Sequence, residues 1–381
     1  GDSIMFRLNT VGFDESLAFS GRGAEKNNFL MNLFLQNEEE DKRLPELYKL
    51  NPKPFEKEIS HVKKALLREL DEFIISEKPS ESFIHVALAN INYNYYSRKE
   101  LYLSSKKAAS YHKDIQYPKN FFTYRDSIEL NDNTLKNYYT YYQFINRYLD
   151  NQAYEGHTKK EPTFNKLSYW HQTQKLKLID SLITNKQLHD NLLYNTIKRY
   201  LVHADDPKKE HDLVALYKEL DHNEAHQKEV ERYAHNTAKI NAGKLIPNIA
   251  LINANNDVIS IQKINTSKTV FFFWNSESVK HYKEIHARVA DLKNKYLEYT
   301  FIGINTGSDT EAWKKTVISS GYNPLHEYQL KNSTIAKNAL FINSANKAMI
   351  VDKGGIILEG NSNLFSQNFE SLLLGYINKK Q

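Results

Sequence analysis

The sequence of 381 residues contains no cysteine, and this absence removes several kinds of chemistry. Without thiols there is no disulfide, no thiolate metal site, no cysteine nucleophile and no dithiol redox reaction. The usual sequence clue to the redox compartment is lost as well. Because the chain starts at Gly1 and not at Met, we expect a processed or trimmed protein whose targeting segment lies outside this sequence.

Long apolar runs and a strong charge bias are also missing. No run of about eighteen apolar residues occurs, so we expect no transmembrane segment in this chain. The 51 Lys and Arg residues are nearly balanced by 46 Asp and Glu residues, and the two signs are interspersed. This composition predicts no nucleic-acid partner. With 40% apolar residues, the chain is long enough for two or three globular domains.

The first two-thirds of the chain predict a short β segment followed by helices. In residues 1–23, DSIMFRLN and ESLAFS alternate apolar and polar positions around a turn at Gly12, which predicts a short β-hairpin or a sheet edge. SGRG lacks the third glycine of a phosphate loop and is interpreted as a plain turn. Over residues 24–240, apolar positions recur every three and four residues, which predicts an α-helical domain. One such stripe is Phe55, Ile59, Val62, Leu66, Leu70 and Phe73.

Residues 244–381 follow a different pattern, in which short apolar runs alternate with helical segments. The continuous runs FFFW and FIGI predict strands buried on both sides, and a helix is expected from about Ser278 to Tyr296. Such alternation predicts a central mixed sheet covered on both faces. We therefore expect a mostly α-helical N-terminal domain followed by an α/β domain.

The motif TVFFFWNSES, together with FIGIN and MIVDKGGII, resembles the thioredoxin fold, specifically its TlpA/ResA-like redoxin branch. The resemblance covers residues 244–381 and implies a tryptophan followed by Cys-x-x-Cys at the start of a helix. Trp274 matches the tryptophan, and Asn275 and Ser278 occupy the two cysteine positions. The family's cis-proline is expected near Asn346. The matching hairpin residues are Asp352, Gly355 and Ile356.

The helical segment resembles a domain that precedes redoxin domains in some envelope proteins, which implies a periplasmic or envelope location. Those proteins often carry a small β-domain upstream, so the resemblance makes residues 1–23 a candidate remnant of that domain. The departures from the family pattern exclude thioredoxin-type catalysis, because neither an amide nor a hydroxyl can replace the reactive thiolate. No proline follows Pro324, so the cis-proline is absent and we expect a trans loop around Asn346.

Other chemistry at this motif is considered and set aside. Ser278 and His281 stand at i, i+3, with Ser276 and Glu284 nearby, which would suit a serine hydrolase. No GxSxG elbow is present. We favour a simpler interpretation, in which Ser276 or Ser278 caps the helix and His281 and His286 are partly exposed.

Two groups of histidines could attract a metal. His222 and His226 stand at i, i+4 without the adjacent glutamate of a zinc-protease motif. The other group is His203, Asp205, Asp206 and His211. Both lie in strongly charged stretches, so solvated helix ends are the favoured interpretation. We expect no metal and no cofactor.

The 25 tyrosines include the runs NYNYY (92–96) and YYTYY (138–142). Such rings can stack on bases or sugars. At helical spacing an aromatic stripe more often packs between helices, and we favour that interpretation.

The leading functional hypothesis is a redox-inactive binding or scaffolding module. Its contact patch would be an exposed Trp274 with Asn275, Ser278 and the Asn346 loop, facing another envelope protein or a peptide. A remnant site without a partner is the bland alternative. The alternative of a different class is an enzyme, or a protein that binds carbohydrate or another small ligand, with its site in the helical domain or the interdomain cleft. The sequence does not predict the oligomeric state.

Overall fold

The computed structural model describes residues 3–7, 17–108, 115–204, 206–366 and 368–378. It divides into two compact units, Gly1–Ile197 with Leu216–Asn223, and Lys198–Ala215 with Glu224–Gln381. We call them unit 1 and unit 2. Much of the segment 198–240, which the sequence places in the helical region, thus shares unit 2 with the sheet. The domain boundaries drawn from the sequence stay a prediction.

Unit 1 begins with the β-hairpin that the alternating pattern predicts. Strands β1 (Ser3–Arg7) and β2 (Ala18–Arg22) pair antiparallel. The turn expected around Gly12 lies outside the described residues. The expected plain turn at SGRG is confirmed only at its last residue, because Ser20, Gly21 and Arg22 belong to β2. Gly23 adopts a left-handed conformation with φ 88° directly before the first helix.

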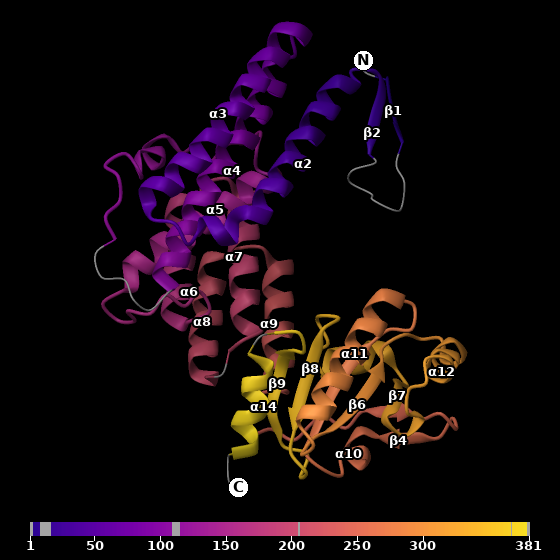
Figure 1. The fold of residues 1–381 in the computed structure, drawn as a ribbon. Coiled ribbons are helices and arrows are strands. Elements are labelled where there is room, and N and C mark those ends of the chain that lie inside the picture. The colour runs from indigo at the N-terminus through magenta and orange to yellow at the C-terminus, as the bar shows by residue number, and fades with distance from the viewer. Residues whose placement is uncertain (1–2, 8–16, 109–114, 205, 367, 379–381) are drawn as a thin grey trace. The chain divides into compact units, whose positions relative to one another are not determined.

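The rest of unit 1 is helical, as expected (Figure 1). Its helices are α2 (Ala24–Leu47), α3 (Pro52–Glu77), α4 (Glu81–Ala108), η1 (Thr123–Ser127), α5 (Tyr139–His157), α6 (Tyr169–Leu182) and most of α7 (Lys186–Leu201). The tyrosine runs lie in α4 and α5. Tyr93 and Tyr141, one from each run, are buried and form an edge-to-face pair with ring centroids 4.9 Å apart. This confirms interhelical packing as the role of these two rings.

Unit 2 contains the start of α8 (Pro207–Leu220), all of α9 (Glu224–Ala238) and the mixed sheet. The strands are β3 (Ala250–Ile252), β4 (Val258–Ser260), β5 (Thr269–Trp274), β6 (Thr300–Asn305), β7 (Glu327–Leu330), β8 (Lys347–Val351) and β9 (Ile357–Asn363). Their order is β4-β3-β7-β6-β5-β8-β9. β6 is parallel to both β5 and β7, and the other pairings are antiparallel.

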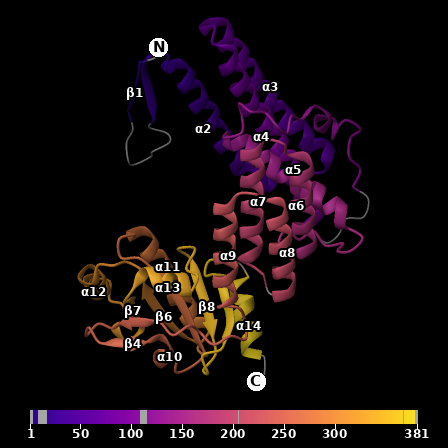
Figure 2. The same ribbon diagram turned by 180° about the vertical axis from the view of Figure 1, so that it is seen from behind.

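The remaining helices cover both faces of this sheet. They are α10 (Ile261–Ile264), α11 (Val279–Lys295), α12 (Thr310–Ser319), η2 (Pro324–His326), α13 (Ser333–Ala339) and α14 (Phe369–Asn378). Along β5, Val270, Phe272 and Trp274 face a core formed with α11, α12 and α14. Phe271 and Phe273 face the opposite core, formed with α10 and α13. α13 can be followed in Figure 2.

The fold class predicted from the sequence is therefore confirmed. A mostly helical N-terminal region precedes an α/β region with a central mixed sheet. The FFFW run forms the fully buried strand β5, and the helix expected from about Ser278 to Tyr296 is α11. None of the described helices combines the length and the apolar character needed to span a bilayer.

Candidate functional site

Trp274 is not exposed, and that expectation from the sequence is wrong. Its side chain is only 1% exposed, because the alternation along β5 directs it into the core beneath α11 and α12. The indole Nε1 donates a hydrogen bond of 3.0 Å to Glu327 Oε2. A ring held in this way cannot serve as a docking surface.

The turn from β5 into α11 is organised by Asn275. Its Oδ1 accepts from Glu277 N at 3.0 Å, and its carbonyl oxygen accepts from Ser278 N at 3.0 Å. Ser278 is exposed at the N-cap position, yet its side chain makes no capping hydrogen bond. The Oγ of Ser276 is buried and has no partner among the described residues. The expectation that Ser276 or Ser278 caps the helix is thus wrong, since the turn already has its acceptors in Asn275.

The structure brings His281 and Asn346 together. Nε2 of His281, in the first turn of α11, lies 3.0 Å from Oδ1 of Asn346. The loop that would carry the family's cis-proline therefore faces the start of α11. No cis peptide occurs in the part of the chain that the structure describes, which confirms the trans loop. Because the imidazole of His281 is engaged with Asn346, the hydrolase hypothesis gains no geometric support. His281 and His286 are partly exposed, as expected.

Beneath this surface lies a buried polar cluster that the sequence did not indicate. Glu327, on β7, is 3% exposed and accepts from Trp274. Its Oε1 also lies 3.3 Å from Nε2 of His286, whose ring stacks on Tyr322 at 3.7 Å between centroids. Gly303 on β6 makes room, because a Cβ there would collide with the Glu327 carboxylate. With these neighbours, Glu327 is a satisfied structural group.

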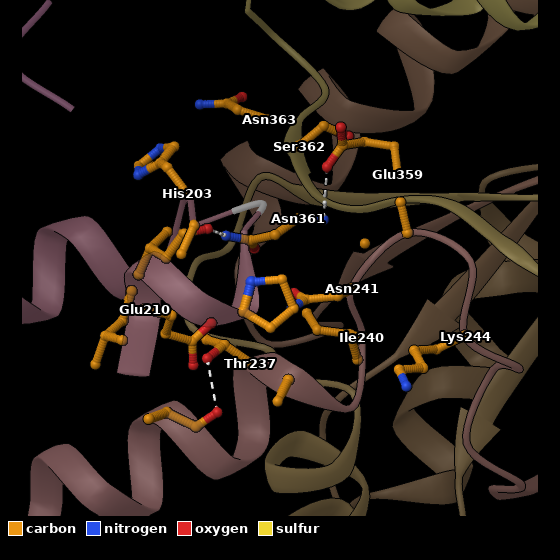
Figure 3. Close-up of a pocket in the computed structure, with 18 of the residues that line it drawn as sticks. His203, Glu210, Thr237, Ile240, Asn241, Lys244, Glu359, Asn361, Ser362 and Asn363 are labelled. Carbon is orange, nitrogen blue, oxygen red and sulfur yellow. Dashed lines mark hydrogen bonds between the residues drawn. The ribbon is translucent and has the colours of Figure 1, made fainter. Parts of the chain in front are cut away.

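A separate cavity of about 870 Å³ lies within unit 2, a volume typical of small-molecule sites. α8, α9, β9 and α14 all contribute to its wall. Figure 3 shows Glu210 and Thr237 on one side of the view and Glu359, Asn361 and Ser362 on the other. Gly360 lets β9 run against the α9 end of the wall, because any Cβ at that position would collide with the Ile240 carbonyl.

Glu210 is the unusual group in this wall. It stands in the first turn of α8, and its side chain is 7% exposed. Burial raises the pKa of the Glu210 carboxyl to about 7, and no charged neighbour offsets that effect. No hydrogen bond to its carboxylate is found among the described residues. A buried acid without a partner is costly unless something else pairs with it.

Lys347 lies directly behind the β9 wall. It is 1% exposed, and burial lowers the pKa of its ammonium group to about 7. Its Nζ donates to Gly360 O at 2.7 Å and to Asn361 Oδ1 at 3.0 Å. Asn361 Nδ2 in turn donates to Val202 O at 2.9 Å. Lys347 thus fixes the strand and the amide that form one side of the cavity.

Sequence reasoning missed Glu210, Glu359 and Lys347, because the signal that sets them apart is burial in the fold. The histidine groups do not assemble into a site. No group of three or more His, Cys, Asp or Glu side chains placed to hold a metal occurs among the described ranges. His203 and His211 line the cavity at its exposed edge, and Asp205 lies outside the described residues.

Comparison with known proteins finds no matching family model and no matching curated protein. Among solved structures, the thioredoxin domain of a thiol-disulfide oxidoreductase from Bacteroides vulgatus is 18% identical, with 36% of this chain and 98% of that one covered and a TM-score of 0.29. A domain of a possible thiol-disulfide isomerase from Cytophaga hutchinsonii is 20% identical, with coverage of 36% and 92% and a TM-score of 0.31. A thiol:disulfide interchange protein from Bacteroides sp. is 19% identical, with coverage of 32% and 81% and a TM-score of 0.28.

Proposed function

We propose that this chain is a redox-inactive, thioredoxin-like protein that binds a small polar ligand in the cavity of unit 2. The observation that carries the proposal is the unpartnered Glu210 carboxyl, 7% exposed in the wall of a cavity of about 870 Å³. A carboxyl kept in this state is the kind of perturbed group that marks functional sites. The resemblance to envelope redoxin proteins suggests the periplasm or cell envelope as the location.

The test compares a variant with a filled cavity to a matched surface variant. Ala234, on α9, lines the cavity, whereas Ala287 is exposed on α11. Wild type, Ala234→Trp and Ala287→Trp are each titrated calorimetrically with a panel of amino acids, amines, monosaccharides and organic acids. We expect at least one compound to bind wild type and Ala287→Trp but not Ala234→Trp. Binding that survives in Ala234→Trp, or no binding by any compound, would overturn the proposal.

The former redox surface is a second candidate, as a contact for a protein or peptide. The exposed Ser278 and the 53% exposed Val279 at the start of α11 favour it. Asn275 lies in the same turn as Ser278, and Asn346 contacts His281. Trp274 takes no part, because it is buried. The test is a pull-down from envelope extract with wild type and Val279→Asp. Partners retained by Val279→Asp would rule out this surface, and partners lost from it would place the contact there.

A further inference from the structure

Several polar side chains of the cavity wall already use their hydrogen-bond donors within the fold. Thr237 Oγ1 lies 3.1 Å from Tyr233 O and 3.0 Å from Ala234 O, so its hydroxyl donates to the backbone of its own helix. Ser362 Oγ likewise donates to Ala348 O at 3.1 Å. The amide of Asn361 is engaged at both ends, by Lys347 and by Val202.

Two carboxylates are left with capacity to accept. Glu210 has no partner among the described residues. Glu359 is half-buried and uses Oε1 to accept from Asn361 N at 3.1 Å, which leaves Oε2. The donors that remain belong to the exposed side chains of Lys244, His203, His211 and Asn363 and to the half-buried side chains of Asn241 and Ser366. Because Glu210 is the buried charged group of this wall and the basic side chains are exposed, a ligand that compensates Glu210 brings donors and positive charge to the interior.

Resting on the proposed function, we infer that the cavity selects ligands with a primary ammonium or guanidinium group, which pairs with the Glu210 carboxylate. Glu359 provides a second acceptor on the β9 side of the cavity (Figure 3). A neutral sugar could also donate to these oxygens, but it would leave the buried charge uncompensated. An ion pair with a cation removes that cost. An anionic ligand would meet two carboxylates.

Such binding depends on pH. Glu210 must ionise to pair with a cation, and burial raises its pKa to about 7. Lys347, behind β9, loses its proton over the same range, since its pKa is lowered to about 7, and this removes a repelling charge. Lys244, His203, His211 and Glu359 are the other titratable groups that line the cavity. We expect the affinity for a cation to rise about tenfold from about pH 6 to about pH 8, as the ionised fraction of Glu210 grows.

The experiment uses two matched pairs of probes, butylguanidine with butylurea and 1,4-diaminobutane with 1,4-butanediol. Each pair keeps the size and exchanges the charged group for a neutral one. Calorimetric titrations of the full chain are run at both pH values with wild type, Glu210→Gln and Glu277→Gln. Glu277 is an exposed glutamate outside the cavity, so its variant controls for the loss of one charge.

We expect a cationic probe to bind wild type and Glu277→Gln at least about tenfold more tightly than its neutral match. In Glu210→Gln the two members of a pair should bind alike, without the rise between the two pH values. Equal binding of charged and neutral probes to wild type would overturn this inference. Binding of neutral or anionic compounds alone would also overturn it. The proposed function would still stand in that case if those compounds failed to bind Ala234→Trp. Glu210→Gln should fold, because it removes a buried acid.

Discussion

Glu100 in unit 1 and Glu210 in unit 2 are both buried glutamates, but only Glu100 is paired with an opposite charge. Glu100 is 0% exposed and receives a two-pronged ion pair from Arg125, at 2.9 Å and 2.8 Å. Tyr124 and Asn151 each donate to it at 2.6 Å. Glu210 is 7% exposed and has no such partner among the described residues. The first holds helices together, whereas the second is poised to accept a partner from outside the chain.

The same contrast extends to the buried lysines. Lys175 in unit 1 pairs with Asp150 at 2.5 Å, and that carboxylate has its pKa lowered by Lys175, His171 and Lys166 against the opposing effect of burial. Lys347 in unit 2 has no ion-pair partner within 4.0 Å among the described residues and donates to neutral oxygens. Unit 1 thus pairs these buried charges with opposite charges, while in unit 2 neither Glu210 nor Lys347 has an ion-pair partner among the described residues.

The largest expected effect concerns Lys347, whose pKa falls from 10.5 to about 7 in the fold. Between these two pKa values Lys347 is protonated in the unfolded chain and neutral in the folded chain. The free energy of unfolding therefore falls by about 5 kcal/mol as the pH drops from about 10.5 to about 7. Lys347→Met abolishes this term. We expect the variant to be less stable than wild type near pH 10, because two acceptors lose their donor, and more stable near pH 7. Urea denaturation at both pH values measures it.

A Lys280→Met variant, on the exposed surface of α11, is the control for Lys347. Its stability difference from wild type should be small and nearly the same at both pH values. If Lys347→Met shows the same flat behaviour, Lys347 is not an uncompensated charge and the contrast between the units weakens.

The next largest effect is expected when Glu100 loses its ion-pair partner, which makes it resemble Glu210. Arg125→Leu leaves a buried carboxylate without its ion-pair partner, which typically costs about 3–5 kcal/mol. The measurement is the free energy of unfolding in guanidinium chloride at neutral pH. Arg43→Leu is the matched control, because Arg43 is 50% exposed and its pairs with Glu40 and Glu58 lie at the surface. A loss below about 1 kcal/mol in Arg125→Leu, equal to that control, would contradict the structural role of the pair.

A smaller and opposite effect is expected for Glu210→Gln. The folded pKa of Glu210 is raised from 4.5 to about 7, so the folded state is favoured below the lower value and loses stability as pH rises through the upper one. The neutral amide avoids that loss. We expect the variant to match wild type near pH 4.5 and to exceed it by about 2–3 kcal/mol near pH 8 without ligand. Thermal unfolding at the two pH values checks it, and a destabilised variant near pH 8 would indicate a hidden partner.

Much of the fold was accessible from the sequence because it follows from local periodicity. The runs FFFW and FIGI predicted buried strands, and β5 and β6 are almost entirely buried. The exposure of Trp274 was misjudged, although the alternation from Val270 through Phe272 already places it on a core face. Glu210 could not be recognised, since its isolation depends on β9 and α14, which follow it by about 150 residues. The periodicity of a sequence predicts on which face of a helix or strand a residue lies. It does not predict which distant elements pack against that face.

The smallest expected change in stability concerns two helix N-termini, one with a side-chain cap and one without. The uncapped one lies at the former redox site. Asp309 caps α12, with Oδ1 accepting from Ala312 N at 2.9 Å, whereas Ser278 makes no such bond at the start of α11. Asp309→Ala should cost about 1 kcal/mol of unfolding free energy, while Ser278→Ala should change it by no more than about 0.3 kcal/mol. Equal losses in denaturant melts would mean that Ser278 does cap α11. If Ser278→Ala leaves the free energy of unfolding unchanged, the exposed hydroxyl does not stabilise the fold. Any loss of partner binding in that variant would then come from the lost contact and not from unfolding.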